Sequence, residues 1–224
     1  MSLIYDLKAL GTQHSVATMQ DMQRDYSPYL VHLTSWGFNK DVRDALKAQI
    51  QPVEIAAGIR QADKMSFDVF QKIVESGELK CSSPRKEEDM PECVCLSECT
   101  LSGVIGHSER YGRFGFVFEK HDMFGLGGRP CVYVDDDVFG CIDANRNKDK
   151  RFGKAFGLAN VYRPSGFGRV QDFTVEREWR VFQPVPVAEA VAVVCPSEYF
   201  NQVRSLITKD IPIFPLDMLY RWCV

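Results

Sequence analysis

The sequence has no long apolar run, and its first residues lack a basic stretch followed by a hydrophobic one. A membrane-spanning helix needs roughly 18 consecutive apolar residues, and a secretory signal needs a charged start before an apolar core. We therefore expect a cytoplasmic protein that does not span a membrane. The glycines between Gly112 and Gly128 match neither the G-x-G-x-x-G spacing nor the P-loop, which excludes those two phosphate-binding fingerprints.

Charge of one sign does not dominate either. The net charge is −3 over 224 residues, so nothing attracts the whole chain to nucleic acid. The stretch 146–169 is nevertheless locally basic, through Lys148, Lys150, Arg151, Lys154, Arg163 and Arg169. It is therefore either a nucleic-acid contact or a solvated charged loop.

The eight cysteines do not follow a zinc pattern. Cys93, Cys95 and Cys99 lie close together, but no second pair and no histidines follow at zinc-ligand spacing. In a cytoplasmic protein these thiols should be reduced, and free cysteine is usually buried. The sequence thus predicts no metal site and a buried strand near Cys93.

Short β-branched and aromatic runs alternate irregularly with a few helical patterns, without regular β-α-β order. This predicts an α+β domain. A helix is expected from Asn39 to about residue 60, ended or interrupted by Pro52, and a second from an N-cap at Ser66 to Gly77. We expect an N-terminal extension (1–28) before one domain (29–224) that contains a helical insertion (39–64). The stretch 135–170 is expected to be a long loop or a partly helical insertion.

The stretch Phe173–Phe182 has the composition of a strand. Alternation places Glu176, Glu178 and Arg180 on one face, and Arg177 on the face of Trp179. The two carboxylates lie roughly 7 Å apart along the strand, and each raises the pKa of the other. Replacing one glutamate relieves their repulsion, so we expect the free energy of unfolding to change little. The pair is typical either of acid and base groups held on a rigid element or of a solvated strand face.

A shorter strand is expected over residues 29–36, where His32 and Thr34 share one face. A lone histidine on a strand is more often a structural hydrogen-bonding residue than a catalytic one. The residues alone leave both a structural and a catalytic role for His32 open.

Several of these segments, taken together, resemble a known family. They are residues 30–34, 67–79, 94–98, 110–116 and 128–133, followed by Glu-Arg-Glu-Trp-Arg at 176–180. The order resembles the bacterial abortive-infection AbiGi group. More distantly, it is similar to ADP-ribosyltransferases of the DarT type, although a Pro-Arg-Ser-Pro run of DarT is missing.

The resemblance implies an ADP-ribosyltransferase-like split sheet, mixed or antiparallel, with flanking helices and with NAD as the substrate. It implies Glu178 as the catalytic glutamate and Glu176 as the preceding acid. It also implies a set of NAD-binding residues: His32 and Thr34 on the first strand, Arg110 at the pyrophosphate and Tyr111 against the nicotinamide.

The function that follows from the resemblance is NAD-dependent modification of a macromolecule (DNA, RNA or protein) in phage–host conflict. The alternative is a non-catalytic interaction or antitoxin module of an abortive-infection system. A catalytic site would bring His32 and Glu178 into one pocket, with side chains within roughly 12 Å of each other. Their placement on opposite surfaces of the sheet would overturn the transferase interpretation.

Overall fold

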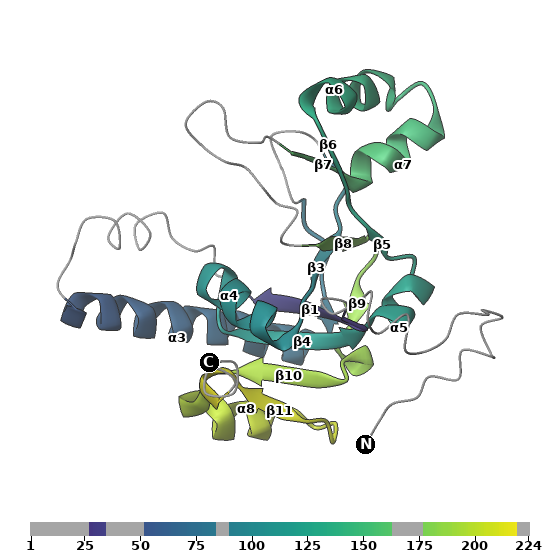
Figure 1. Ribbon diagram of the computed structural model, residues 1–224. Coiled ribbons are helices and arrows are strands. Elements are labelled where there is room, and N and C mark those ends of the chain that lie inside the picture. Colours follow the sequence, from purple (N-terminus) through teal and green to yellow (C-terminus); the bar gives the residue numbers. More distant parts are fainter. Residues whose placement is uncertain (1–26, 35–51, 84–89, 163–176, 219–224) are drawn as a thin grey trace, which may run out of the picture.

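The computed structural model describes residues 27–34, 52–83, 90–162 and 177–218 (Figure 1). In this part the chain forms a mixed α+β fold around a seven-stranded sheet with the order β11-β10-β4-β1-β3-β8-β5. The strands are, in that order, Ile213–Pro215, Ala192–Cys195, Phe114–Glu119, Tyr29–Thr34, Val94–Glu98, Glu178–Val181 and Arg129–Pro130. Neighbouring strands are antiparallel except β10 and β11, which are parallel. The α+β class predicted from the sequence is confirmed.

The strand pairing divides the sheet into two parts, which meet where β1 contacts β3. All six residues of β1 pair with β4, whereas only Leu30 and Val31 pair with β3. Beyond this short contact β3 leaves β1 and pairs with β8, and β8 pairs with β5 (Figure 1). Strand β8 is therefore an internal strand, with a neighbour on each side.

Helices cover the two faces of the β1–β4 part. Helix α3 (Pro52–Ser76) places Phe70 against Phe116, with ring centroids 4.7 Å apart. Helix α4 (Leu101–Tyr111) places Val104 in a second apolar cluster that contains Val31. Because neighbouring strand residues point to opposite faces, Leu30 belongs to the α3 cluster and Val31 to the α4 cluster.

Helix α3 corrects two expectations. The sequence predicted that Pro52 would end or interrupt a helix and that Ser66 would cap the next one. Instead Pro52 is the first residue of a single helix that runs past Ser66 to Ser76. Proline is well suited to a first helical position, because its missing N–H has no intrahelical acceptor there. The expected helical segment 39–51 lies outside the described residues.

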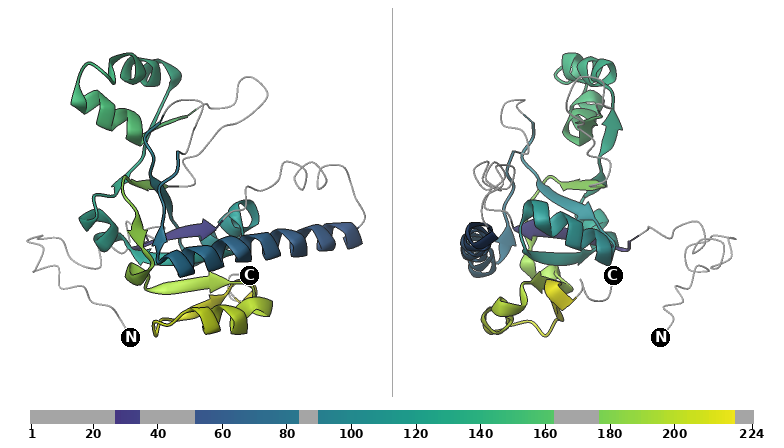
Figure 2. Two further views of the ribbon diagram at one scale, coloured as in Figure 1. Left: turned by 180° about the vertical axis from the view of Figure 1, so that it is seen from behind. Right: turned by 60° about the vertical axis from the view of Figure 1, so that its left-hand side comes forward.

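The segment 132–161 forms a helical arm that projects from the sheet (Figure 2). Strands β6 (Val132–Val134) and β7 (Ala159–Val161) pair in parallel. In the chain they are connected by helices α6 (Asp136–Asn145) and α7 (Lys150–Leu158). The side chains of Asp135 and Asp149 accept hydrogen bonds from the first turns of α6 and α7. Residues 136–158 of the expected loop are therefore mostly helical, and residues 163–170 lie outside the described residues.

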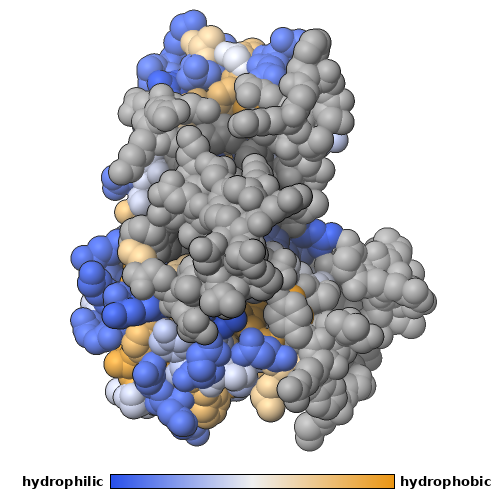
Figure 3. Space-filling view, turned by 90° about the vertical axis from the view of Figure 1, so that its left-hand side faces the viewer, coloured by the Kyte–Doolittle hydropathy of each residue, from blue (hydrophilic) through white to orange (hydrophobic). Residues whose placement is uncertain are grey.

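The arm exposes most of its surface. None of the residues in α6 is buried, and hydrophilic residues surround a smaller apolar area at this end of the molecule (Figure 3). Four cations of the predicted basic stretch, Lys148, Lys150, Arg151 and Lys154, are exposed on it.

The remaining elements complete the fold. They are β2 (Glu78–Leu79), α5 (Lys120–Gly125), β9 (Val185–Pro186), two short 3-10 turns (Val187–Glu189 and Ser197–Tyr199) and α8 (Phe200–Leu206). Strand β11 lies at the edge of the sheet, where Pro212 and Pro215 are tolerated because proline cannot donate to a further strand. Across the described segments, no helix is both long and apolar enough to cross a membrane.

Candidate functional site

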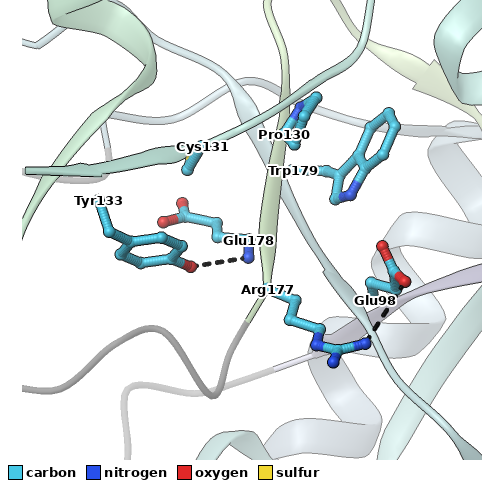
Figure 4. Close-up of a pocket in the computed structure, with 7 residues that line it drawn as sticks. All are labelled: Glu98, Pro130, Cys131, Tyr133, Arg177, Glu178 and Trp179. Carbon is cyan, nitrogen blue, oxygen red and sulfur yellow. Dashed lines mark hydrogen bonds and ion pairs between the residues drawn. The ribbon is translucent and has the colours of Figure 1, made fainter. Parts of the chain in front are cut away.

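A pocket of about 250 Å³ opens where the chain enters β8 (Figure 4). It is built from the end of β3, from β5 and the start of the arm, and from Arg177 and the first residues of β8. The lining residues are Glu98, Pro130, Cys131, Tyr133, Arg177, Glu178 and Trp179. Two carboxylates, one arginine and two aromatic rings therefore meet in one place.

The Glu178 carboxylate accepts hydrogen bonds on both of its oxygens. Arg180 donates from Nε to Oε1 at 2.9 Å and from Nη2 to Oε2 at 3.0 Å, and Asn160 of β7 donates to Oε2 at 3.0 Å. Arg180 also donates to the carbonyls of Gly157 and Ala159. Glu178 is 8% exposed and Arg180 is 1% exposed. The solvated-face interpretation is wrong for both, because the base of the arm covers this face of β8.

The ion pair determines the charge of Glu178. Burial acts to raise the pKa of this carboxyl, but the hydrogen bonds and the charge of Arg180 outweigh it and leave the pKa below its usual value. The nearby thiol of Cys131 responds in the opposite way, since burial and the Glu178 charge raise its pKa. The pocket therefore contains an ionised carboxylate beside a neutral thiol at neutral pH.

The lowered pKa of Glu178 predicts how the stability of the folded protein changes in acid. A carboxyl with a lower pKa in the folded state contributes stability above its unfolded pKa, and that contribution is lost as the pH falls through its folded pKa. Urea unfolding between pH 7 and pH 3 should therefore show a smaller loss of stability in a Glu178→Gln/Arg180→Met variant than in the wild-type protein. If the free energy of unfolding fell equally with pH in the two proteins, the stabilising role of the ion pair would be contradicted.

Arg177 begins the site with an unusual backbone conformation. Its φ is 41°, in the left-handed region that residues with a Cβ seldom adopt. Its carbonyl accepts from the Glu98 N–H at 3.2 Å, and the next N–H, of Glu178, donates to the Tyr133 hydroxyl at 3.0 Å. The faces predicted for Glu178, Trp179 and Arg180 are confirmed. The side chain of Arg177 contacts Glu98, which shares the face of Leu96 and Trp179, so Arg177 also lies on the predicted side.

Glu98 is a second acidic residue in the pocket, and two cations converge on it. Lys120 Nζ lies 2.8 Å from Oε2, and Arg177 Nη1 lies 3.7 Å from Oε1 (Figure 4). Lys120 also lies over the Trp179 ring, 5.7 Å from its centroid. Sequence reasoning did not select Glu98, although it ends the 94–98 segment that took part in the family resemblance.

His32 and Thr34 are not part of this pocket. Val31 pairs with Ser97, and Ser97 pairs with Glu178, so Glu178 shares the face of Val31 and the neighbouring His32 points to the other face. Nδ1 of His32 lies 2.8 Å from the Cys95 carbonyl. Desolvation lowers the pKa of this histidine despite that contact. The expectation of one pocket for His32 and Glu178 is wrong, and the structural role considered for the histidine fits its contacts.

Thr34 also has structural contacts, being 1% exposed with its hydroxyl directed at the carbonyls of Ser66 and Phe114. Arg110 and Tyr111 form the last turn of α4, where the Tyr111 ring stacks on His107 at 5.9 Å. Tyr111 does not line the pocket. Glu176 and the side chain of Arg110 lie outside what the structure describes. Of the predicted site residues whose side chains are described, Glu178 alone lines this pocket.

The thiols near Glu178 form no evident metal site. Cys93 and Cys95 have sulfur atoms 3.8 Å apart and are free thiols. Within the described segments, no group of three or more His, Cys, Asp or Glu residues has an arrangement that could hold a metal ion. The sequence-based expectation of a metal-free cluster stays a prediction, which metal analysis of the purified protein can test.

No protein-family model matches the chain, and no curated protein matches its sequence. Among solved structures, the fold is similar to that of DarT from Thermus sp. 2.9 in complex with NAD+. The TM-score is 0.40 at 9% sequence identity, over 85% of this chain and 96% of that one. Membership of the AbiGi group stays a prediction, and what this chain does is inferred below from its own pocket residues.

Proposed function

We propose that this protein is an NAD-dependent ADP-ribosyltransferase in which Glu178 stabilises the positive charge that develops on the ribose. One observation carries the proposal: an ionised carboxylate is held in a fixed orientation in the wall of a pocket. Arg180 and Asn160 supply that orientation, and neither lines the pocket itself.

The chemistry suits such a carboxylate. Breaking the nicotinamide–ribose bond passes through an oxocarbenium-like state, as in glycoside hydrolysis. A preorganised negative charge near the anomeric carbon lowers the energy of that state without reorganisation during the reaction. Arg180 weakens the field of Glu178, but it also keeps the carboxyl ionised in a buried position.

The other lining residues suit a nucleotide substrate. Tyr133 and Trp179 offer aromatic surface to a planar ring. The pocket volume of about 250 Å³ is below the range of roughly 300–1,000 Å³ that encloses a drug-sized ligand. The pocket thus suits one end of NAD, its nicotinamide and the adjoining ribose.

The acceptor is proposed to be a macromolecule, namely DNA, RNA or protein, in phage–host conflict. Glu176 is the proposed acid that activates the acceptor, a role that rests on its place two residues before Glu178. Cations on the arm, among them Lys150 and Lys154, are the proposed contact if the acceptor is a nucleic acid. His32, Thr34 and Tyr111 have no role in this proposal, because none of them lines the pocket, and the side chain of Arg110 is not described.

A second candidate is a non-catalytic interaction or antitoxin module of an abortive-infection system. Two observations favour it. Both oxygens of Glu178 already accept hydrogen bonds, as in a purely structural ion pair. His32 and Glu178 lie on opposite faces of the sheet, the placement that counts against the transferase. In that case the ion pair specifies how the arm attaches to the sheet and carries out no chemistry.

Nicotinamide release separates the two candidates. Purified protein should release nicotinamide from NAD, and release should rise when DNA, RNA or a protein extract is supplied separately as acceptor. Mass spectrometry of the stimulating acceptor should then show an added ADP-ribosyl group. A folded protein that releases none with any acceptor would contradict the enzyme and favour the interaction module.

A further inference from the structure

Two thiols that the proposed reaction does not use lie side by side at the start of β3. Cys93 directly precedes this strand, and Cys95 is its second residue. Side chains two residues apart point to the same face of a strand, and the two sulfur atoms are 3.8 Å apart. Cys93 is 1% exposed, whereas Cys95 is half-buried. A small oxidant can therefore reach the pair from the side of Cys95.

The two thiols share a face with the ion pair that orients Glu178. Cys95 lies opposite Arg180 in the register of β3 and β8, and residues directly opposite each other on neighbouring strands are close contacts on one face. The backbone of Cys93 is fixed by two hydrogen bonds with Ser82. A rearrangement of this pair therefore acts on the strand that positions Arg180.

The chemical environment makes the two thiols unequal. The hydrogen bond from Cys95 lowers the pKa of Cys93 despite burial, and the charge of Arg180 adds to this effect. The same hydrogen bond and burial raise the pKa of Cys95. A thiolate is the nucleophile in reactions of cysteine with oxidants, and a neighbouring thiol can then resolve the first product into a disulfide. The pair combines these two requirements.

We infer that Cys93 and Cys95 are an oxidant-sensitive modification site, which a hydroperoxide converts into a reversible disulfide that distorts the pocket. The Cys93 thiolate attacks one peroxide oxygen, the O–O bond breaks, and the released hydroxide takes up a proton to become water. The Cys95 sulfur then attacks the sulfenic sulfur of Cys93, and its proton leaves with the hydroxyl group as a second water. Two thiols and one hydrogen peroxide thus give one disulfide and two waters. The effect on activity rests on the proposed function, whereas the disulfide itself does not.

The new bond would bend β3. Alternate residues of an extended strand have Cα atoms roughly 6.6 Å apart, whereas most disulfides join Cα atoms about 5.5–6 Å apart. Closing the bond therefore shortens the strand around Val94, which pairs with Val181 of β8. The ring encloses one intervening residue, so it restricts the unfolded chain little and adds little stability in compensation. Strain of this kind makes a disulfide easier to reduce, so a thiol reductant should reverse the change.

Peptide mapping after oxidation tests the site. The full chain, first reduced and then treated with hydrogen peroxide, should give a peptide that has lost two hydrogen atoms and in which iodoacetamide no longer alkylates Cys93 and Cys95. Nicotinamide release should fall by about tenfold or more, since a shift of about 1 Å near a catalytic group can cost about 100-fold. The melting temperature should fall too, and a thiol reductant should restore both. Cys95→Ser should escape these changes, whereas Cys141→Ser, which removes an exposed thiol of α6, is the matched control and should behave as wild type.

The outcomes separate the modification site from the proposed reaction. If Cys93 and Cys95 both stay open to alkylation, or if either joins Cys81 or Cys131 instead, the inference is overturned. A bond between the two that leaves the nicotinamide release of an active protein unchanged would also overturn it. In a protein that releases no nicotinamide, the bond with a lowered melting temperature would uphold the site and contradict the proposed reaction, whereas the bond with an unchanged melting temperature would overturn both.

Discussion

Replacing Arg180 by methionine should lower the free energy of unfolding by about 3–5 kcal/mol, the usual cost of removing one partner from a buried ion pair. The variant leaves the buried carboxylate of Glu178 without its cation and the carbonyls of Gly157 and Ala159 without this donor. Methionine has a similar length and no charge, so the expected loss comes from the interaction and not from a large cavity. Urea unfolding, with the midpoint and the slope both measured, gives the result.

A double variant tests whether the effect belongs to the pair. Glu178→Met together with Arg180→Met removes both charges, and replacing a whole buried pair by apolar residues is often neutral or stabilising. The double variant should therefore be more stable than Arg180→Met alone, a coupling that a double-mutant cycle measures. Arg204→Met breaks an exposed pair with Asp210 and should leave the midpoint almost unchanged. An Arg180→Met protein as stable as wild type would show that the pair does not hold the arm.

Glu178→Gln should reduce nicotinamide release by about 100-fold or more, the usual effect of removing one electrostatic contact to a transition state. Glutamine preserves the size of the side chain and removes the negative charge. The loss should appear in kcat more than in KM, because the charge acts mainly on the oxocarbenium-like state. Steady-state release from NAD, per folded molecule, is the measurement.

The stability of this variant must be measured beside its activity. From the sequence, loss of one of two like-charged neighbours should change stability little. The ion pair reverses that expectation, since Glu178→Gln leaves Arg180 buried and turns an amide N–H₂ towards the donors of Arg180 or Asn160. Assays well below the melting temperature, with Glu75→Gln on the exposed side of α3 as the control, separate the two effects. A folded Glu178→Gln protein that releases nicotinamide at close to the wild-type rate would exclude the proposed role.

The sequence was informative where a pattern is local. Alternation placed Glu178 beside Arg180 on one face of the strand and Trp179 on the other, as the structure has them. Pro52 was misread because the same residue can end a helix or begin one. The positive φ of Arg177 carries no local signal in the sequence, since no glycine marks it.

The site itself depends on contacts between distant residues, which residue patterns do not report. Asn160 and Glu178 are 18 residues apart, and Tyr133 and Glu178 are 45 apart. Nothing in the residues around Asn160 indicates that its amide reaches a carboxylate on another strand. The sheet register likewise separates His32 from Glu178, and alternation within each strand could not reveal that their faces differ.

The internal position of β8 also has a consequence for how the protein is made. Strand β3 pairs with β8 on one side, yet about 80 residues of chain separate their partners, from Val94 with Val181 to Ser97 with Glu178. During synthesis, at roughly 5–20 residues per second, β3 leaves the ribosome seconds before its neighbour exists. Until then its backbone N–H and C=O groups are an open edge, which can pair with other nascent chains. Chains that stop before β8 should therefore aggregate more readily than the complete protein, and chaperone binding should be strongest in that interval.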